Sequence, residues 1–192
     1  MRTSLLALAG VLALLTGCST GAGAVEVNNG GEFRFVAGTP SGEVIPERER
    51  GTAPQFSGTM LETGDRFDSS KLADQVVVLN FWGSWCAPCR VETPEFSDVW
   101  KDYTTAGVQF LGVDVKETDK QFATAFIERF AIGFPSLYDP RGEVALAFRD
   151  FPANAIPSTI VLDPLWRVAA VYTGSVSTDD LRGVIDRVLG EE

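Results

Sequence analysis

Two cysteines separated by two residues are the strongest candidates for chemistry in this chain. Cys86 and Cys89 lie within residues 82–89, which read WGSWCAPC. Cysteines at this spacing can form and open a disulfide, and the thiolate is the nucleophile in such exchange. The chain has no histidine, so Ser/His/Asp triads, Cys/His dyads and histidine-ligated metals are excluded. Its chemistry must therefore depend on cysteines or carboxylates.

The same pair has two simpler interpretations. A C-x-x-C can be half of a zinc site, but the chain holds only 3 cysteines and no histidine to complete four ligands. A purely structural disulfide remains open, although a bridge across so short a loop constrains the unfolded chain little. A thiol peroxidase is disfavoured, because the Pro-x-x-x-Thr-x-x-Cys loop of those enzymes is missing around Cys86.

The elements on either side of the pair favour a reactive cysteine. Residues 75–81 (QVVVLNF) form a continuous apolar run, which predicts a strand buried on both faces. A helix is predicted to follow, with an apolar stripe that begins just after Cys89 and is made by Phe96, Val99, Trp100 and Tyr103. Cys86 then lies at the N-terminal end of this helix, where free N–H groups and the helix dipole lower the thiol pKa. Pro88 suits the first turn of this helix, because a backbone N–H at that position would have no partner within the helix.

The remaining body predicts an alternation of strands and helices. Residues 108–115 indicate a second buried strand and so a β-α-β unit. Asp119 opens a predicted helix, and we expect its stripe of Phe122, Phe126 and Phe130 to be core. An antiparallel hairpin over 158–162 and 167–172 precedes a final helix capped by Ser177. The predicted order is β-α-β-α followed by β-β-α.

The N-terminal region is typical of an exported lipoprotein. Residues 1–17 carry one basic residue and a short apolar run, which indicates a signal peptide. The run ends in LTGC at Cys18, a lipobox-like sequence that predicts lipidation of this cysteine; a secretory signal with an incidental cysteine or an uncleaved anchor are the alternatives. Residues 18–51 are expected to form a tether, with a short strand at 33–36 and a solvated charge run at 47–50.

Composition and charge limit which partners the chain can have. The chain has 192 residues, 45% of them hydrophobic, which suits one globular domain with an extension. Its 16 basic and 26 acidic residues give a net charge of −10. Such a surface repels phosphate backbones, so no nucleic-acid partner is expected.

Residues 80–90, NFWGSWCAPCR, resemble the thioredoxin superfamily and specifically its TlpA/ResA branch of membrane-attached extracytoplasmic thiol-disulfide oxidoreductases. The resemblance covers roughly residues 53–190. It implies a thioredoxin-like α/β domain over residues 52–192, with a central mixed sheet flanked by helices. An inserted segment is expected between the two halves of this fold.

The resemblance also implies site roles. It makes Cys86 the exposed nucleophile and Cys89 the buried resolving thiol. Pro157, in the sequence IPST, matches the family's cis-proline, whose loop pairs with the substrate chain; an ordinary trans turn proline is the alternative. The substrate contacts expected from the resemblance are Trp85, Ala87, Pro88, Ile156 and Pro157.

Proton handling differs from that of cytoplasmic thioredoxins. Those proteins carry a buried Asp six residues before the first cysteine, where this chain has Asn80. Glu92, three residues after Cys89, matches an acid beside the active site in the ResA-like branch, and the resemblance gives it the proton-handling role. The alternative is a solvated helix carboxylate.

The expected function is that of a lipid-anchored thiol-disulfide oxidoreductase in the cell envelope, acting as a reductase of proteins such as apocytochrome c. Its partners would be protein thiols and disulfides, the membrane through its lipid, and a transmembrane thiol electron donor, since the compartment is oxidising. We expect a monomer, and we expect no cofactor or metal besides the disulfide. A disulfide-forming oxidase and a redox-inert binding lipoprotein with a thioredoxin fold are the competing hypotheses.

Overall fold

The computed structural model describes residues 44–148 and 155–191. The expected signal peptide, Cys18, the tether up to residue 43 and the strand at 33–36 lie outside the described residues. Within the described part of the chain, no helix is long and apolar enough to cross a membrane.

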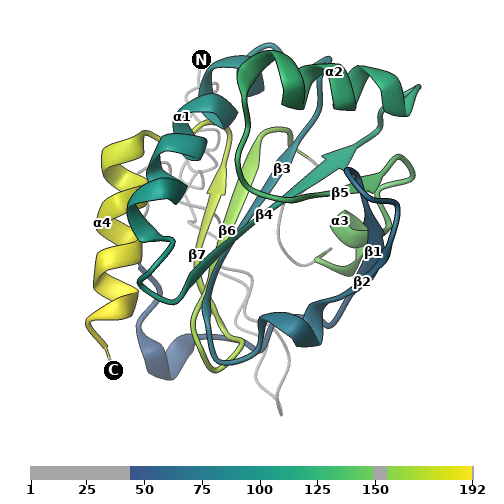
Figure 1. The fold of residues 1–192 in the computed structure, drawn as a ribbon. Coiled ribbons are helices and arrows are strands. Elements are labelled where there is room, and N and C mark those ends of the chain that lie inside the picture. The colour runs from purple at the N-terminus through teal and green to yellow at the C-terminus, as the bar shows by residue number, and fades with distance from the viewer. Residues whose placement is uncertain (1–43, 149–154, 192) are drawn as a thin grey trace, which may run out of the picture. The chain divides into compact units, whose positions relative to one another are not determined.

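A mixed sheet runs through the body, with its described strands in the order β2-β1-β5-β4-β3-β6-β7 (Figure 1). The strands are β1 Ser57–Met60, β2 Arg66–Asp68, β3 Val76–Trp82, β4 Val108–Val115, β5 Ser136–Asp139, β6 Ser158–Leu162 and β7 Val168–Thr173. Strands β3, β4 and β5 are parallel, and β6 is antiparallel to β3. The mixed sheet expected from the sequence is confirmed.

Helices cover both faces of this sheet. They are α1 Cys89–Tyr103, α2 Lys120–Phe130, α3 Glu143–Ala147 and α4 Thr178–Leu189, with 3-10 turns at Glu47–Glu49 and Ser69–Leu72. Residues of α1, α2 and α4 pack in one core cluster with both cysteines. Residues of α3 pack in a second cluster with the other face of β3 and β4. The thioredoxin-like α/β fold therefore places the cysteine pair at the edge of one core.

The inserted segment between the two halves adds a strand to the sheet. Following β4, the chain forms α2, β5 and α3 before it reaches β6. Strand β5 pairs with β4 on one side and β1 on the other, and so joins the β1–β2 hairpin to the sheet. Neither β5 nor this hairpin is predicted from the sequence.

The expected burial of two residues, Phe122 and Arg50, is wrong. Phe122 is 57% exposed, whereas Phe126 is 5% exposed and stacks on Trp82. Side chains four positions apart on a helix point in directions about 40° apart around the helix axis. Three residues at this spacing therefore cannot all face one narrow core stripe. Arg50 is buried in the predicted solvated run and pairs with Asp163 at 3.1 Å and Glu191 at 2.7 Å.

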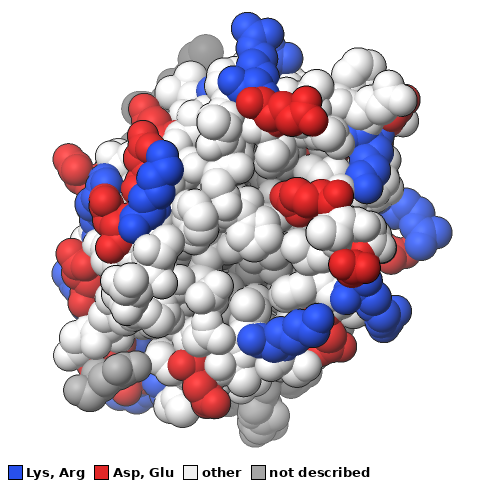
Figure 2. Space-filling view, in the orientation of Figure 1, with Lys and Arg blue, Asp and Glu red and all other residues white. Residues whose placement is uncertain are grey.

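The charged side chains of both signs are mixed on the face of the molecule drawn in Figure 2. Figure 2 shows acidic and basic side chains interspersed over one face, mainly toward its periphery, with white side chains across much of the middle. No broad basic area is present on this face.

Candidate active site

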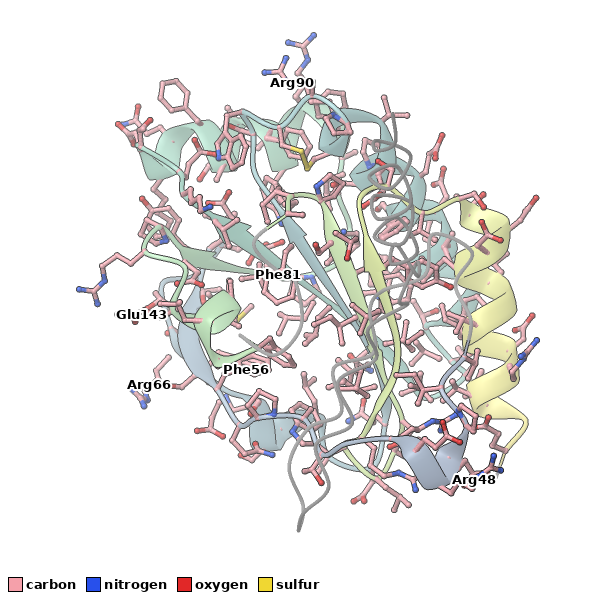
Figure 3. The ribbon with its side chains drawn as sticks, turned by 180° about the vertical axis from the view of Figure 1, so that it is seen from behind. Arg48, Phe56, Arg66, Phe81, Arg90 and Glu143 are labelled. Atoms are coloured by element: carbon pink, nitrogen blue, oxygen red, sulfur yellow. A yellow bond between two sulfur atoms is a disulfide. The ribbon has the colours of Figure 1, made fainter. Side chains whose placement is uncertain are left out.

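Cys86 and Cys89 are joined by a disulfide where the buried strand β3 passes into α1 (Figure 3). Cys89 is the first residue of α1, and its backbone N–H donates to Sγ of Cys86 at 3.2 Å. A helix-terminal N–H aimed at sulfur stabilises the negative charge of a thiolate. The predicted position of Cys86 at the helix N-terminus is confirmed.

Burial of the pair differs from the sequence expectation. Cys86 is 3% exposed and Cys89 is fully buried, so the prediction of an exposed Cys86 is wrong for the disulfide form. The neighbours of Cys86 are the exposed residues: Trp85 is 48% exposed, and Ala87 and Pro88 are also exposed. These three residues therefore form the exposed surface next to Cys86.

The loop before Cys86 is held in place by polar contacts. The Trp85 indole Nε1–H donates to the carbonyl of Val115 at 3.1 Å, and the Ser84 N–H donates to the Glu117 carboxylate at 3.1 Å. A Cβ at Gly83 would lie 2.5 Å from the Trp85 Nε1, so only glycine permits this packing of the indole. The disulfide is therefore carried by a preorganised loop.

Pro157 lies beside the end of β3. The Ile156–Pro157 bond is cis, as the resemblance implies, and the trans alternative is excluded. Ser158 pairs with Phe81 in the sheet, so Pro157 comes next to the point where the chain leaves β3 for the cysteine loop. Ile156 is half-buried and packs against the core cluster that contains both cysteines.

Glu92 is the centre of a buried polar network. It is 3% exposed, which excludes the solvated alternative. Its Oε1 accepts from the Asn80 Nδ2 at 3.0 Å, and its Oε2 accepts from the Val176 N–H at 3.0 Å. Asn80 also donates to Oγ1 of Thr159, two residues after Pro157. The network thus ties the active-site helix, β3, the cis-proline strand and the loop before α4 together.

Burial raises the pKa of Glu92 to about 7, although the hydrogen bonds from Val176 and Asn80 act to lower it. A carboxyl group with this pKa is close to evenly divided between its acid and its base form at neutral pH. Groups with such pKa values are suited to general acid–base catalysis near pH 7.

Asp114 is a second buried carboxyl group, which is not among the site residues predicted from the sequence. It lies on β4 beside Trp82, the last residue of β3, and neither of its oxygens has a hydrogen-bond partner among the described residues. Burial and then the nearby charges of Glu117 and Asp139 raise its pKa to about 8. An Asp inside the otherwise apolar strand run LGVDV is the sequence signal that could have identified it.

We expect the free energy of unfolding to fall between pH 5 and pH 8. The folded pKa values of Glu92 and Asp114 lie above the ordinary carboxyl values near 4, so the folded state binds more protons than the unfolded state in this range. Each group can lower stability by up to about 1.4 kcal/mol per pH unit as the pH rises toward its folded pKa. Urea unfolding at pH 5, 6.5 and 8 measures this slope.

Asp114→Asn is expected to make the slope shallower, because the amide does not titrate. Asp98→Asn is the matched control, since it makes the same substitution at a side chain that is 75% exposed. An unaltered slope in Asp114→Asn would show that this carboxyl group has an ordinary pKa.

Among the described residues, no three His, Cys, Asp or Glu side chains gather in a way that could hold a metal ion. Asn80 links Glu92 on the helix that begins at Cys89 with Thr159 on the strand that follows the cis-proline, so these residues form the candidate site. A family model described as AhpC/TSA matches residues 50–171. The chain belongs to the AhpC/TSA family.

Individual relatives narrow the activity within this thioredoxin-fold family. The chain is 33% identical over 137 residues to the thiol-disulfide oxidoreductase ResA of Geobacillus kaustophilus, a match that spans 71% of this chain and 76% of the relative. It is 33% identical over 131 residues to ResA of Bacillus subtilis, spanning 67% and 69%.

Solved structures show the same relationship. A DsbF homologue from Corynebacterium diphtheriae is 35% identical with a TM-score of 0.71, and the match covers 77% of this chain and 92% of that one. A secreted thiol-disulfide isomerase from Corynebacterium glutamicum is 33% identical with a TM-score of 0.73, covering 78% and 92%. This member of the AhpC/TSA family is thus a thioredoxin-like thiol-disulfide oxidoreductase of the ResA type.

Proposed function

We propose that the chain reduces disulfides of envelope proteins through the Cys86–Cys89 pair. The observation that carries the proposal is the Cys89 N–H directed at the Cys86 sulfur at the start of α1. This contact favours the thiolate at Cys86 over that at Cys89, which has no exposed surface. Cys86 is therefore the nucleophile and Cys89 the resolving thiol.

The reaction passes through one mixed disulfide. The Cys86 thiolate attacks a sulfur of the client disulfide, a new S–S bond forms, and the other client sulfur leaves as a thiolate that takes up a proton. Cys89 then loses its proton and attacks the Cys86 sulfur, which releases the second client thiolate and forms the Cys86–Cys89 disulfide. Two electrons pass from the cysteine pair to the client.

Glu92 serves as the proton acceptor for Cys89. It lies one helical turn after Cys89 in α1, and its pKa of about 7 leaves a large fraction ionised at neutral pH. Asn80 occupies the strand position beside it and cannot accept a proton, but its Nδ2 orients the Glu92 carboxylate. The carboxylate returns its proton to solvent after the disulfide has formed.

Electron flow toward clients is favoured by the Ala87–Pro88 dipeptide, which is close to the Gly-Pro of reducing thioredoxins. A disulfide-forming oxidase is the second candidate and uses the same residues in the reverse direction. A redox-inert binding protein is disfavoured by the buried carboxyl network around Glu92, which a scaffold has no need to keep.

The proposed location is the extracytoplasmic face of a membrane, with a lipid anchor at Cys18. The lipobox-like sequence supports the anchor, and the secreted Corynebacterium glutamicum relative supports export. Because this compartment is oxidising, the pair needs electrons from a transmembrane thiol donor. Envelope proteins such as apocytochrome c are the proposed clients. Covalent trapping of clients by Cys89→Ser tests this mechanism.

A further inference from the structure

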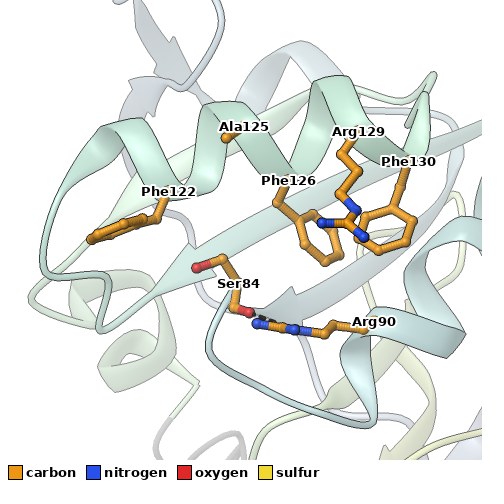
Figure 4. A pocket seen from close by; sticks show the side chains of 7 residues that line it. All are labelled: Ser84, Arg90, Phe122, Ala125, Phe126, Arg129 and Phe130. Carbon is orange, nitrogen blue, oxygen red and sulfur yellow. Dashed lines mark hydrogen bonds between the residues drawn. The ribbon is translucent and has the colours of Figure 1, made fainter.

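A hollow beside the disulfide loop is not used by the chemistry described so far. Its volume is about 280 Å³, slightly below the range of sites for drug-sized ligands, so it suits one or two side chains of a peptide. Figure 4 shows it between the cysteine loop and α2. The residues used below are Ser84, Arg90, Phe122, Phe126, Arg129 and Phe130.

Two guanidinium groups border this hollow without an acidic partner. In Figure 4, Arg129 descends from α2 and Arg90 lies below it, on the side of the cysteine loop. The Arg90 Nε donates to the Ser84 carbonyl at 3.1 Å, and the Arg129 guanidinium lies 5.6 Å from the Phe130 ring centroid. Among the described residues, neither arginine forms an ion pair, as is also true of Arg66 and Arg187, whereas Arg48, Arg50, Arg141, Arg167 and Arg182 do.

The apolar part of the hollow is open to a partner. Phe126 and Phe130 line it from α2, and Phe122 is 57% exposed at its rim. Trp85, at 48% exposed, precedes Cys86 in the same loop as Ser84. Exposed aromatic side chains grouped around a site mark a contact surface for a protein partner.

We propose that this hollow binds an acidic side chain of the client, close in sequence to the client's reactive cysteine. The proposal rests on the proposed function and specifies its substrate class. The two guanidinium groups bring positive charge to the hollow, where the nearest acid the contacts show is Glu117, already held by the Ser84 N–H, and guanidinium groups match carboxylates in charge and shape. The Arg90 Nε lies 3.1 Å from the Ser84 carbonyl, and Ser84 comes two residues before Cys86, while an extended chain advances about 3.3 Å per residue. The acidic residue is therefore expected within about three residues of the client cysteine.

Two probe peptides test this inference. Both contain the same internal disulfide, and one carries Glu where the other carries Gln beside the cysteine. The full chain is reduced beforehand, and the second-order rate constants for reduction of both peptides are measured by stopped flow at low salt. Wild type should reduce the Glu peptide about three- to fivefold faster, the size expected for partly exposed ion pairs, and salt should diminish the ratio.

Arg129→Glu should bring this ratio to one or below. Arg187→Glu is the matched control, because both arginines lie in the last turn of their helices, α2 and α4, and both changes alter the net charge equally. The control should keep the wild-type ratio. Reduction of the uncharged 2-hydroxyethyl disulfide by wild type reports on the proposed function separately.

The outcomes are distinguishable. Equal rates for the two peptides in wild type, or an unchanged ratio in Arg129→Glu, overturn the acidic-client inference while exchange with the uncharged disulfide leaves the proposed function standing. If wild type reduces none of the three disulfides, the acidic-client inference and the proposed function are both overturned.

Discussion

Cys89→Ser should accumulate client proteins bound covalently through Cys86, and Cys86→Ser should accumulate none. In the first variant the mixed disulfide forms but no thiol is left to resolve it. In the second variant the remaining thiol, Cys89, is fully buried and lacks the helix-terminal N–H contact of Cys86. Both variants should lose catalysed turnover by about three orders of magnitude or more, as expected when a nucleophilic unit is broken.

Non-reducing electrophoresis of envelope extracts, followed by reduction, reveals such adducts. Cys18 is the third cysteine of the chain, so the adducts must persist in a Cys18→Ser, Cys89→Ser double variant. Equal trapping by the two single variants would contradict the assignment of nucleophile and resolving thiol.

Glu92→Gln should slow the resolving step about a hundredfold at pH 7, the lower end of what a positioned general base contributes. In wild type, the rate of this step should rise with pH through about 7, as the Glu92 carboxyl group ionises. In the variant this rise should be absent, and the rate should increase only toward the ordinary thiol pKa near 8.5. Stopped-flow single turnovers between about pH 6 and pH 9 measure the profile.

The same substitution should also cost stability, because Glu92 accepts hydrogen bonds from two buried donors and a glutamine side chain offers only one oxygen. The loss is expected to be about 1–3 kcal/mol, so rates must be expressed per folded molecule. Asp98→Asn is the control, since the Asp98 side chain lies on the same helix and is 75% exposed. Equal profiles for Glu92→Gln and wild type would leave Glu92 with a structural role alone.

The elements that sequence patterns predicted well are those with long, regular periodicity. Strands β3 and β4 are continuous apolar runs, and α2 and α4 begin at the capping residues Asp119 and Ser177 that the sequence indicates. The β1–β2 hairpin and β5 are short, and strand pairing rather than local pattern determines them. Their positions follow from the completed sheet, which a local window does not contain.

The candidate site shows a similar division. Residue types and spacing located the Cys86–Cys89 pair, and the resemblance located Pro157 and Glu92. Burial could not be predicted, because Glu92 becomes buried only when the loop before α4 closes over α1 and Val176 donates to it. The pairing of Arg50 with Asp163, 113 positions away, likewise depends on the tertiary fold.

The reduction potential of the Cys86–Cys89 pair tests the claim of reductase activity most directly. It can be measured by equilibrating the protein with defined ratios of reduced and oxidised dithiothreitol or glutathione and quantifying the free thiols. We expect a value near that of thioredoxin, about −270 mV, which would let the pair transfer electrons to client disulfides. A value near that of the strong periplasmic oxidant DsbA, about −120 mV, would contradict reductase activity and assign the chain to disulfide formation.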